Sequence, residues 1–253
     1  MRKGRIGAVA AIAVGVVFLG ALPASAAPGE GSAYGAEAGV TLLGQASVQT
    51  GRLAPSDSTG TTDATAVGIA VPGILDSGTV GTSAVRDDAG VVAARASTED
   101  LSVGVLGLLG TIRADAVTAQ CQGTADGVTG SAQLAGLDLG NLGTVGADAA
   151  PNTVVPVRAL GITVATITLN EQIKGADDTL TVNALHVKLL GGVLGSLGTG
   201  DVVVSSATCG LGAAPVPLAS GAGLWAGLAL LGVAAVPAGI RVARRRGVLS
   251  RTA

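Results

Sequence analysis

The feature that most constrains this chain is an apolar segment without a single charged residue, residues 218–240. At a rise of about 1.5 Å per residue, a helix of this length crosses a hydrocarbon core of roughly 30 Å. One indole lies near its outer end and a run of guanidinium groups follows its last residue. These flanking residues are Trp225, Arg241, Arg244, Arg245 and Arg246. We therefore predict one transmembrane helix over 218–240, anchored by these five side chains.

The same arginines predict the orientation of the chain. By the positive-inside rule, the basic tail 241–253 stays in the cytoplasm, so the part before the helix faces out. Sorted wall proteins carry an LPxTG-type motif just outside such a helix, and residues 213–221 contain none. We expect a retained, single-pass plasma-membrane protein with an extracellular N-terminal domain and a cytoplasmic C-terminus.

The N-terminus has the pattern of a secretory signal peptide over residues 1–26. A basic start is followed by an apolar stretch, a proline and the small residues Ala24-Ser25-Ala26. Signal peptidases cut after such a site, so we predict that the mature chain begins at Ala27. The alternative is an uncleaved N-terminal anchor.

Charge is strongly segregated between the middle of the chain and its ends. All 17 acidic residues lie between the two apolar segments, together with only seven of the 15 basic ones, which leaves the middle at seven minus seventeen, or −10. Phosphate binding needs lysine and arginine, so the acidic middle argues against a nucleic-acid partner.

The middle of the chain has the pattern of short strands. Apolar and polar residues alternate, β-branched residues are frequent, and Pro, Gly and Asp clusters separate the runs. The predicted strands include residues 79–86, 128–139, 154–169, 179–189 and 202–209. Helix is the competing interpretation, but glycine is frequent here and costs a helix roughly 1 kcal/mol per residue relative to alanine. We predict a mainly β fold, an antiparallel sandwich or barrel-like domain over 37–211, between flexible linkers at 27–36 and 212–217.

Two cysteines, Cys121 and Cys209, are the only ones in the sequence. Both lie in the part predicted to be exported, where a disulfide is the usual state. Free thiols, metal binding and catalysis are the alternatives. Two sulfurs and one histidine do not make a typical structural zinc site, so we expect a disulfide and no metal or cofactor.

Several segments carry a resemblance to a known family. These are residues 114–121, which end in Cys121; Leu169-Asn170-Glu171-Gln172; residues 180–187; and residues 200–210. Together they resemble the choice-of-anchor P family of actinobacterial surface proteins, over roughly residues 35–211. The resemblance implies an exported domain with a variable C-terminal anchor. It implies no activity and no catalytic residue.

No catalytic constellation is evident in the sequence. His186, the only histidine, would have to serve any Ser-His-Asp triad. On a regular strand it shares a face with Leu180, Val182 and Ala184, and we expect a structural or surface role. The adjacent acids Asp87-Asp88, Glu99-Asp100 and Asp177-Asp178 read as turn caps rather than paired acid–base catalysts.

Three functional hypotheses follow. The first is a non-enzymatic, membrane-anchored surface protein with a structural or adhesive role, whose partner is a cell-wall polymer or another surface protein. The second is a module that binds a small ligand or Ca²⁺ through its Asp-rich turns, although no D-x-D-x-D-G loop is present. The third, and the least favoured, is a hydrolase built around His186.

Overall fold

The computed structural model describes residues 29–41, 47–104, 110–175, 177–191 and 198–212. The predicted signal peptide with its cleavage site (Ala24, Ala26 and Ala27), the predicted helix 218–240 with Trp225, and the arginine tail lie outside these ranges. Within them, no helix has the length and apolar character that a membrane crossing requires.

The described residues form two seven-stranded sheets in which every pairing is antiparallel. Sheet A has the order β11-β12-β13-β14-β1-β2, with β3 also paired to β1, and sheet B has the order β10-β9-β8-β6-β5, with β7 paired to β8 and β4. The elements are β1 (Gly31–Thr41), β2 (Val48–Leu53), β3 (Ser56–Asp57), β4 (Asp63–Val67), β5 (Ala70–Val71), β6 (Leu75–Asp76), β7 (Thr79–Arg86), β8 (Val92–Val103), β9 (Ile112–Thr124), β10 (Gly127–Ala135), the 3₁₀ turn η2 (Gly140–Leu142), β11 (Thr153–Ala159), β12 (Ile162–Lys174), β13 (Leu180–Leu190) and β14 (Thr199–Cys209).

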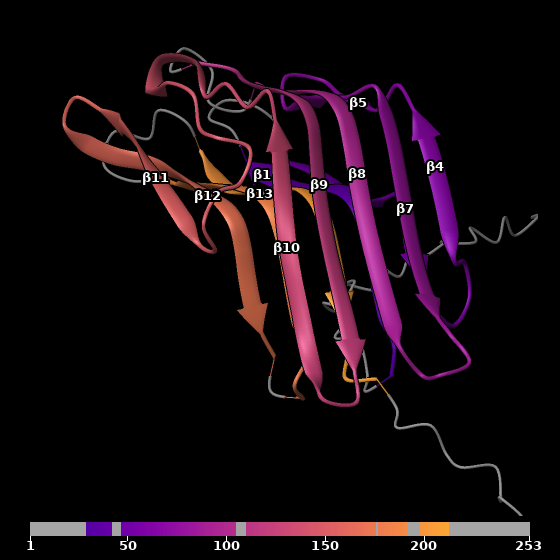
Figure 1. Cartoon of the computed structure of the whole chain (residues 1–253). Helices are drawn as coiled ribbons and strands as arrows, with labels where there is room; N and C mark the ends of the chain where they lie inside the picture. Colours follow the sequence, from indigo (N-terminus) through magenta and orange to yellow (C-terminus); the bar gives the residue numbers. More distant parts are fainter. Residues whose placement is uncertain (1–28, 42–46, 105–109, 176, 192–197, 213–253) are drawn as a thin grey trace, which may run out of the picture.

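The two sheets pack face to face in a sandwich-like fold, so the prediction of a mainly antiparallel β domain is confirmed. Figure 1 shows β10, β9, β8, β7 and β4 as the front layer, with β1 and β13 behind it. The core between the layers is built from alanine, valine, leucine and isoleucine, together with the two cysteines. Because these side chains are small, the sheets can approach closely at several points.

Gly35 of β1 marks one such close approach. A Cβ atom placed there would collide with Cγ1 of Val80 in β7 on the other sheet. Gly130 of β10 marks a second close approach, since a Cβ there would collide with Cγ2 of Val182 and lie 3.1 Å from Cδ2 of Leu180, both in β13. Glycine is required at these positions by packing rather than by backbone conformation.

Regular alternation of side chains reverses in the middle of several long strands. In β14, Val202 and Val204 are buried before the break, and Ala207 and Cys209 after it. Between them Ser205 has a φ of 53°, the left-handed conformation, which lets the strand change the phase of its alternation. Asn170 in β12 and Asp100 in β8 have the same conformation, with φ of 49° each.

The break in β14 also places a polar link between the sheets. The hydroxyl of Ser205 donates to the carbonyl of Val117 in β9 at 2.8 Å and lies 2.9 Å from the hydroxyl of Thr98 in β8. Both hydroxyl side chains are fully buried. Each hydroxyl has a hydrogen-bond partner, as buried polar groups in folded proteins generally do.

The predicted linker at 27–36 is wrong for residues 31–36, which form the first half of β1. Its glycine, serine and alanine residues have the composition of a linker, yet β1 lies between β14 and β2 in sheet A and pairs with both. Small residues are needed here because β1 faces the close approach of β7. The predicted linker at 212–217 lies outside the described residues except for Gly212, whose N–H donates to the carbonyl of Thr124.

Candidate functional site

A polar cluster occupies the outer face of sheet A, centred on His186 of β13. Its neighbours Leu185 and Val187 are fully buried in the core, so the imidazole points the other way. Nδ1 lies 2.9 Å from Oε2 of Glu171 in β12, and Nε2 lies 2.9 Å from Oδ1 of Asp201 in β14. The ring therefore bridges two carboxylates across three adjacent strands.

This geometry sets the charge of the imidazole. Only the doubly protonated ring can donate to both carboxylates. Burial opposes that charge, but the hydrogen bonds and negative charges of Glu171 and Asp201 outweigh burial and raise the pKa of His186 above its usual 6.5. Burial would likewise raise the pKa of Glu171, but hydrogen bonds from His186 and Asn183 hold it below its usual 4.5.

The cluster continues through neutral side chains. Nδ2 of Asn183 donates to the same Oε2 of Glu171 at 2.7 Å, and the Ser206 hydroxyl donates to Oδ1 of Asn183 at 2.7 Å. Ser206 is fully buried and Asn183 is 5% exposed, although both lie on the outer face. We call Glu171, Asn183, His186, Asp201 and Ser206 the His186 cluster.

Tyr34 extends the cluster towards the β2 edge. Its phenol shares a hydrogen bond with Ser206, and burial raises its pKa above the usual 10.0. The guanidinium of Arg52 lies 4.8 Å above the ring centroid, a cation–π distance, and 3.6 Å from the carboxylate of Glu37. Tyr34 is thus covered by Arg52, and its ring is not free to stack on a ligand.

The cluster's hydrogen bonds oppose a hydrolytic role. While both carboxylates are bound, the imidazole of His186 has no lone pair with which to accept a proton from a nucleophile. The one serine in the cluster, Ser206, donates to Asn183 rather than to His186. The arrangement fits a closed structural network better than a general base.

The sequence prediction for the face of His186 is wrong. Leu180 and Val182 point towards sheet B, where Gly130 approaches them, whereas His186 lies on the outer face. The phase reversal near Ala184 separates them. Glu171, Asn183 and Asp201 were missed as partners, although each lies in a segment that carries the family resemblance. Nothing but the pairing of β12, β13 and β14 brings them together.

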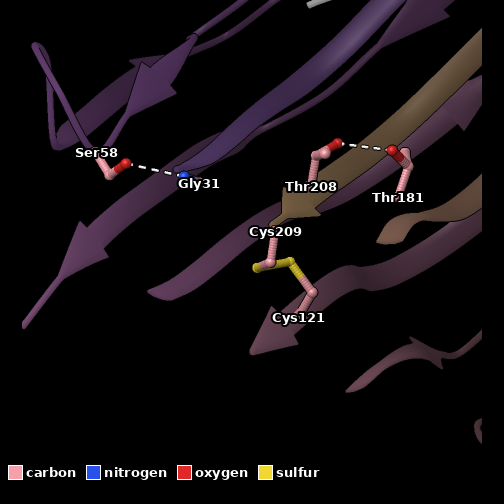
Figure 2. The surroundings of a disulfide bond; sticks show 6 residues. All are labelled: Gly31, Ser58, Cys121, Thr181, Thr208 and Cys209. Carbon is pink, nitrogen blue, oxygen red and sulfur yellow. Dashed lines mark hydrogen bonds between the residues drawn. A yellow bond between two sulfur atoms is a disulfide. The ribbon is translucent and has the colours of Figure 1, made fainter. Parts of the chain in front are cut away.

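The predicted disulfide between Cys121 and Cys209 is confirmed. Figure 2 shows it joining the end of β9 to the end of β14, and so one sheet to the other, beside the Thr181–Thr208 hydroxyl pair. The bond spans 88 residues of sequence. In the chain-entropy model, closing such a loop stabilises the fold by about 4.6 kcal/mol.

The Asp-rich turns do not assemble a cation site in the described part of the chain. No group of three or more His, Cys, Asp or Glu side chains is placed there to hold a metal ion. Asp87 instead accepts a hydrogen bond from the N–H of Val91 at 2.8 Å, across the β7–β8 turn. Asp178 sits in a turn with a φ of 53°. Both fit the predicted role of turn residues. The same prediction is wrong for Glu99 and Asp100, which lie within β8.

A shallow, open groove of about 550 Å³ lies on the outer face of sheet B, across β7, β8, β9 and β10. No sequence signal predicted it. Its polar side chains come from all four strands: Ser83, Arg95, Gln120, Gln122, Thr129 and Ser131. Volumes of this size are typical of ligand sites.

Comparison of the chain with protein-family models, with curated proteins and with solved structures gave no match.

Proposed function

We propose that this chain is a non-enzymatic surface protein that displays its acidic β domain outside the plasma membrane and acts in adhesion. The observation that carries the proposal is the buried Cys121–Cys209 disulfide. Structural disulfides persist in oxidising compartments and are rare in the cytosol. An exported domain of this kind is consistent with the signal peptide and with the arginine-flanked helix at 218–240.

The two ends of the described domain lie together, which suits a domain carried on one stalk. The N–H of Gly29 donates to the carbonyl of Leu211 at 2.6 Å, and the N–H of Gly210 donates to the carbonyl of Glu30 at 2.8 Å. The chain that leads from the signal peptide and the chain that leads to the anchor therefore leave from one end. We expect a partner to bind at the opposite end or on the outer faces of the sheets.

The non-enzymatic part of the proposal rests on the His186 cluster, in which each imidazole nitrogen is hydrogen-bonded to a carboxylate. The resemblance to the choice-of-anchor P family fits the same picture, since that family combines an exported domain with a variable anchor. As partners we propose the membrane for the anchor and a cell-wall polymer or surface protein for the domain, without a cofactor and without nucleic acid.

Lysine labelling tests the proposed location. Lys174 and Lys188 are the only lysines of the described domain, and both are exposed. Intact cells that express the full chain would be treated with a membrane-impermeant amine reagent, and peptides would be identified by mass. We expect both lysines to be modified on intact cells to the same extent as in lysates. Labelling only after lysis would refute an extracellular domain.

A further inference from the structure

The groove on the outer face of sheet B is built from side chains in strict cross-strand register. Ser83 of β7 is opposite Arg95 of β8, Arg95 is opposite Gln120 of β9, and Gln120 is opposite Ser131 of β10. This row crosses three interstrand gaps, or about 14 Å. Figure 1 shows the four strands side by side in the front layer, facing away from sheet A.

A second row runs parallel to the first and forms the hollow. Here Val85, Ala93, Gln122 and Thr129 are opposite one another on the same four strands. Ala93 is short and lies two residues from Arg95 on the same face of β8, so the surface dips beside the guanidinium. Because the groove is an open hollow on the face of the sheet that crosses four strands, it suits an extended chain better than an enclosed small molecule.

The chemistry of the lining differs from the rest of the domain. Arg95 is the only charged side chain that lines the groove, in a domain with ten more acidic than basic residues. Within the described chain its guanidinium forms no ion pair. The other polar groups are neutral amides and hydroxyls. Gln120 donates to Ser131 at 3.1 Å, which leaves its own carbonyl oxygen as an acceptor for a ligand.

We propose that this groove, the Arg95 groove, binds an extended polyhydroxylated polymer that carries anionic groups. Arg95 would pair with a carboxylate or phosphate of the polymer, and the amides and hydroxyls of Gln120, Gln122 and Thr129 would bond to its hydroxyl groups. An unpaired guanidinium in an acidic domain marks one place where a negatively charged chain is attracted rather than repelled. The inference deepens the proposed adhesive function and rests on it for the polymer's location outside the cell.

The residues that line the groove also predict a modest affinity for the polymer. No aromatic residue lines it, so stacking on sugar rings does not contribute. Binding then depends on a charged pair at an exposed site, which salt screens. A polymer with repeated anionic groups would gain from several copies of the chain on one surface.

The experiment measures binding of the purified full chain, in detergent micelles, to two anionic polymers. Polygalacturonate supplies carboxylates and poly(glycerol phosphate) supplies phosphodiesters, and the two arms separate the possible sources of the anion. Fully methyl-esterified polygalacturonate and dextran are the neutral controls. We expect at least one anionic polymer to bind at least ten-fold more tightly than its neutral counterpart, with affinity falling as salt rises.

Variants then assign the binding to the groove. Arg95→Gln should weaken binding at least ten-fold, and Arg95→Lys should restore part of it. Arg158→Gln, an exposed arginine of β11 on the other sheet, is the matched control and should bind like the wild type. Failure of both anionic polymers to bind, or unchanged binding by Arg95→Gln, would overturn the proposal. Neither result would affect the lysine-labelling test of the proposed location, which does not involve the groove.

Discussion

At the scale of single residues, His186 carries the most information about what the domain does. Its two ring nitrogens each meet a carboxylate at 2.9 Å, and Asn183 and Ser206 extend the network inwards. A cation held in this way joins β12, β13 and β14 on the face away from the core. Its role follows from fixed charge and hydrogen bonding rather than from proton transfer.

This arrangement predicts how stability depends on pH. The pKa of His186 is raised above its usual value of 6.5, so the charged imidazole stabilises the fold fully below pH 6.5. This stabilisation is lost as pH rises through the pKa of the folded state. The pKa of Glu171 is lowered below its usual value of 4.5, so the charged carboxylate stabilises the fold fully above pH 4.5. This stabilisation is lost as pH falls through the pKa of the folded state. We expect the free energy of unfolding of the full chain to be greatest between about pH 4.5 and 6.5.

Denaturant unfolding across pH, with His186→Gln as the comparison, checks this prediction. His186 is the only histidine, so the variant should lose the fall in stability above pH 6.5 that the wild type shows. Equal pH profiles for the two proteins above pH 6.5 would mean that the imidazole does not carry a charge in the fold.

At the scale of elements, most strands were predictable but their faces were not. Alternation and turn residues indicated β7, β10, β13 and β14 within a few residues. The sequence between 154 and 169 reads as one run, yet it is the hairpin β11–β12, turned at Leu160 and Gly161 with φ of 51° and 82°. Single left-handed residues such as Ser205 shift the alternation, and a period-two pattern cannot anticipate them.

The strand β1 shows a different limit of prediction from sequence. Its residues have low strand propensity and indicate a linker, and only the approach of the other sheet explains why they are small. The partners of His186 could not be predicted for a similar reason. Glu171, Asn183 and Asp201 lie on different strands, and their proximity follows only from the order of β12, β13 and β14 in the sheet. The disulfide was predictable because two cysteines in a part predicted to be exported allow only one pairing.

Packing at Gly35 can be tested directly. Gly35→Ala would drive a methyl group into Val80, and we expect a loss of roughly 1–3 kcal/mol in the free energy of unfolding. Gly39→Ala, on the same strand with no atom within 4 Å of the added Cβ, is the matched control and should change stability little. Adding Val80→Ala to Gly35→Ala should recover part of the loss. Equal effects at Gly35 and Gly39 would show that strand propensity, not sheet approach, decides the cost.

At the scale of the whole molecule, a sandwich of small residues is closed by one disulfide, and the two ends of the described domain lie side by side. The domain has ten more acidic than basic residues, the Arg95 groove on sheet B is lined by one basic side chain, and the side chains of the His186 cluster on sheet A bond to one another. These features fit the displayed binding domain that we propose. The proposed display function depends on the domain lying on the outer side of the membrane.

Protease treatment of intact cells is the most direct measurement of that claim. The full chain would carry a C-terminal tag after Ala253, and cells would be treated with protease before lysis. The account predicts that the domain is removed by cleavage before residue 218, leaving a short tagged fragment of the helix and tail in the membrane. A full-length tagged chain that is protected in intact cells, or that is recovered in the soluble cytosolic fraction, would contradict it.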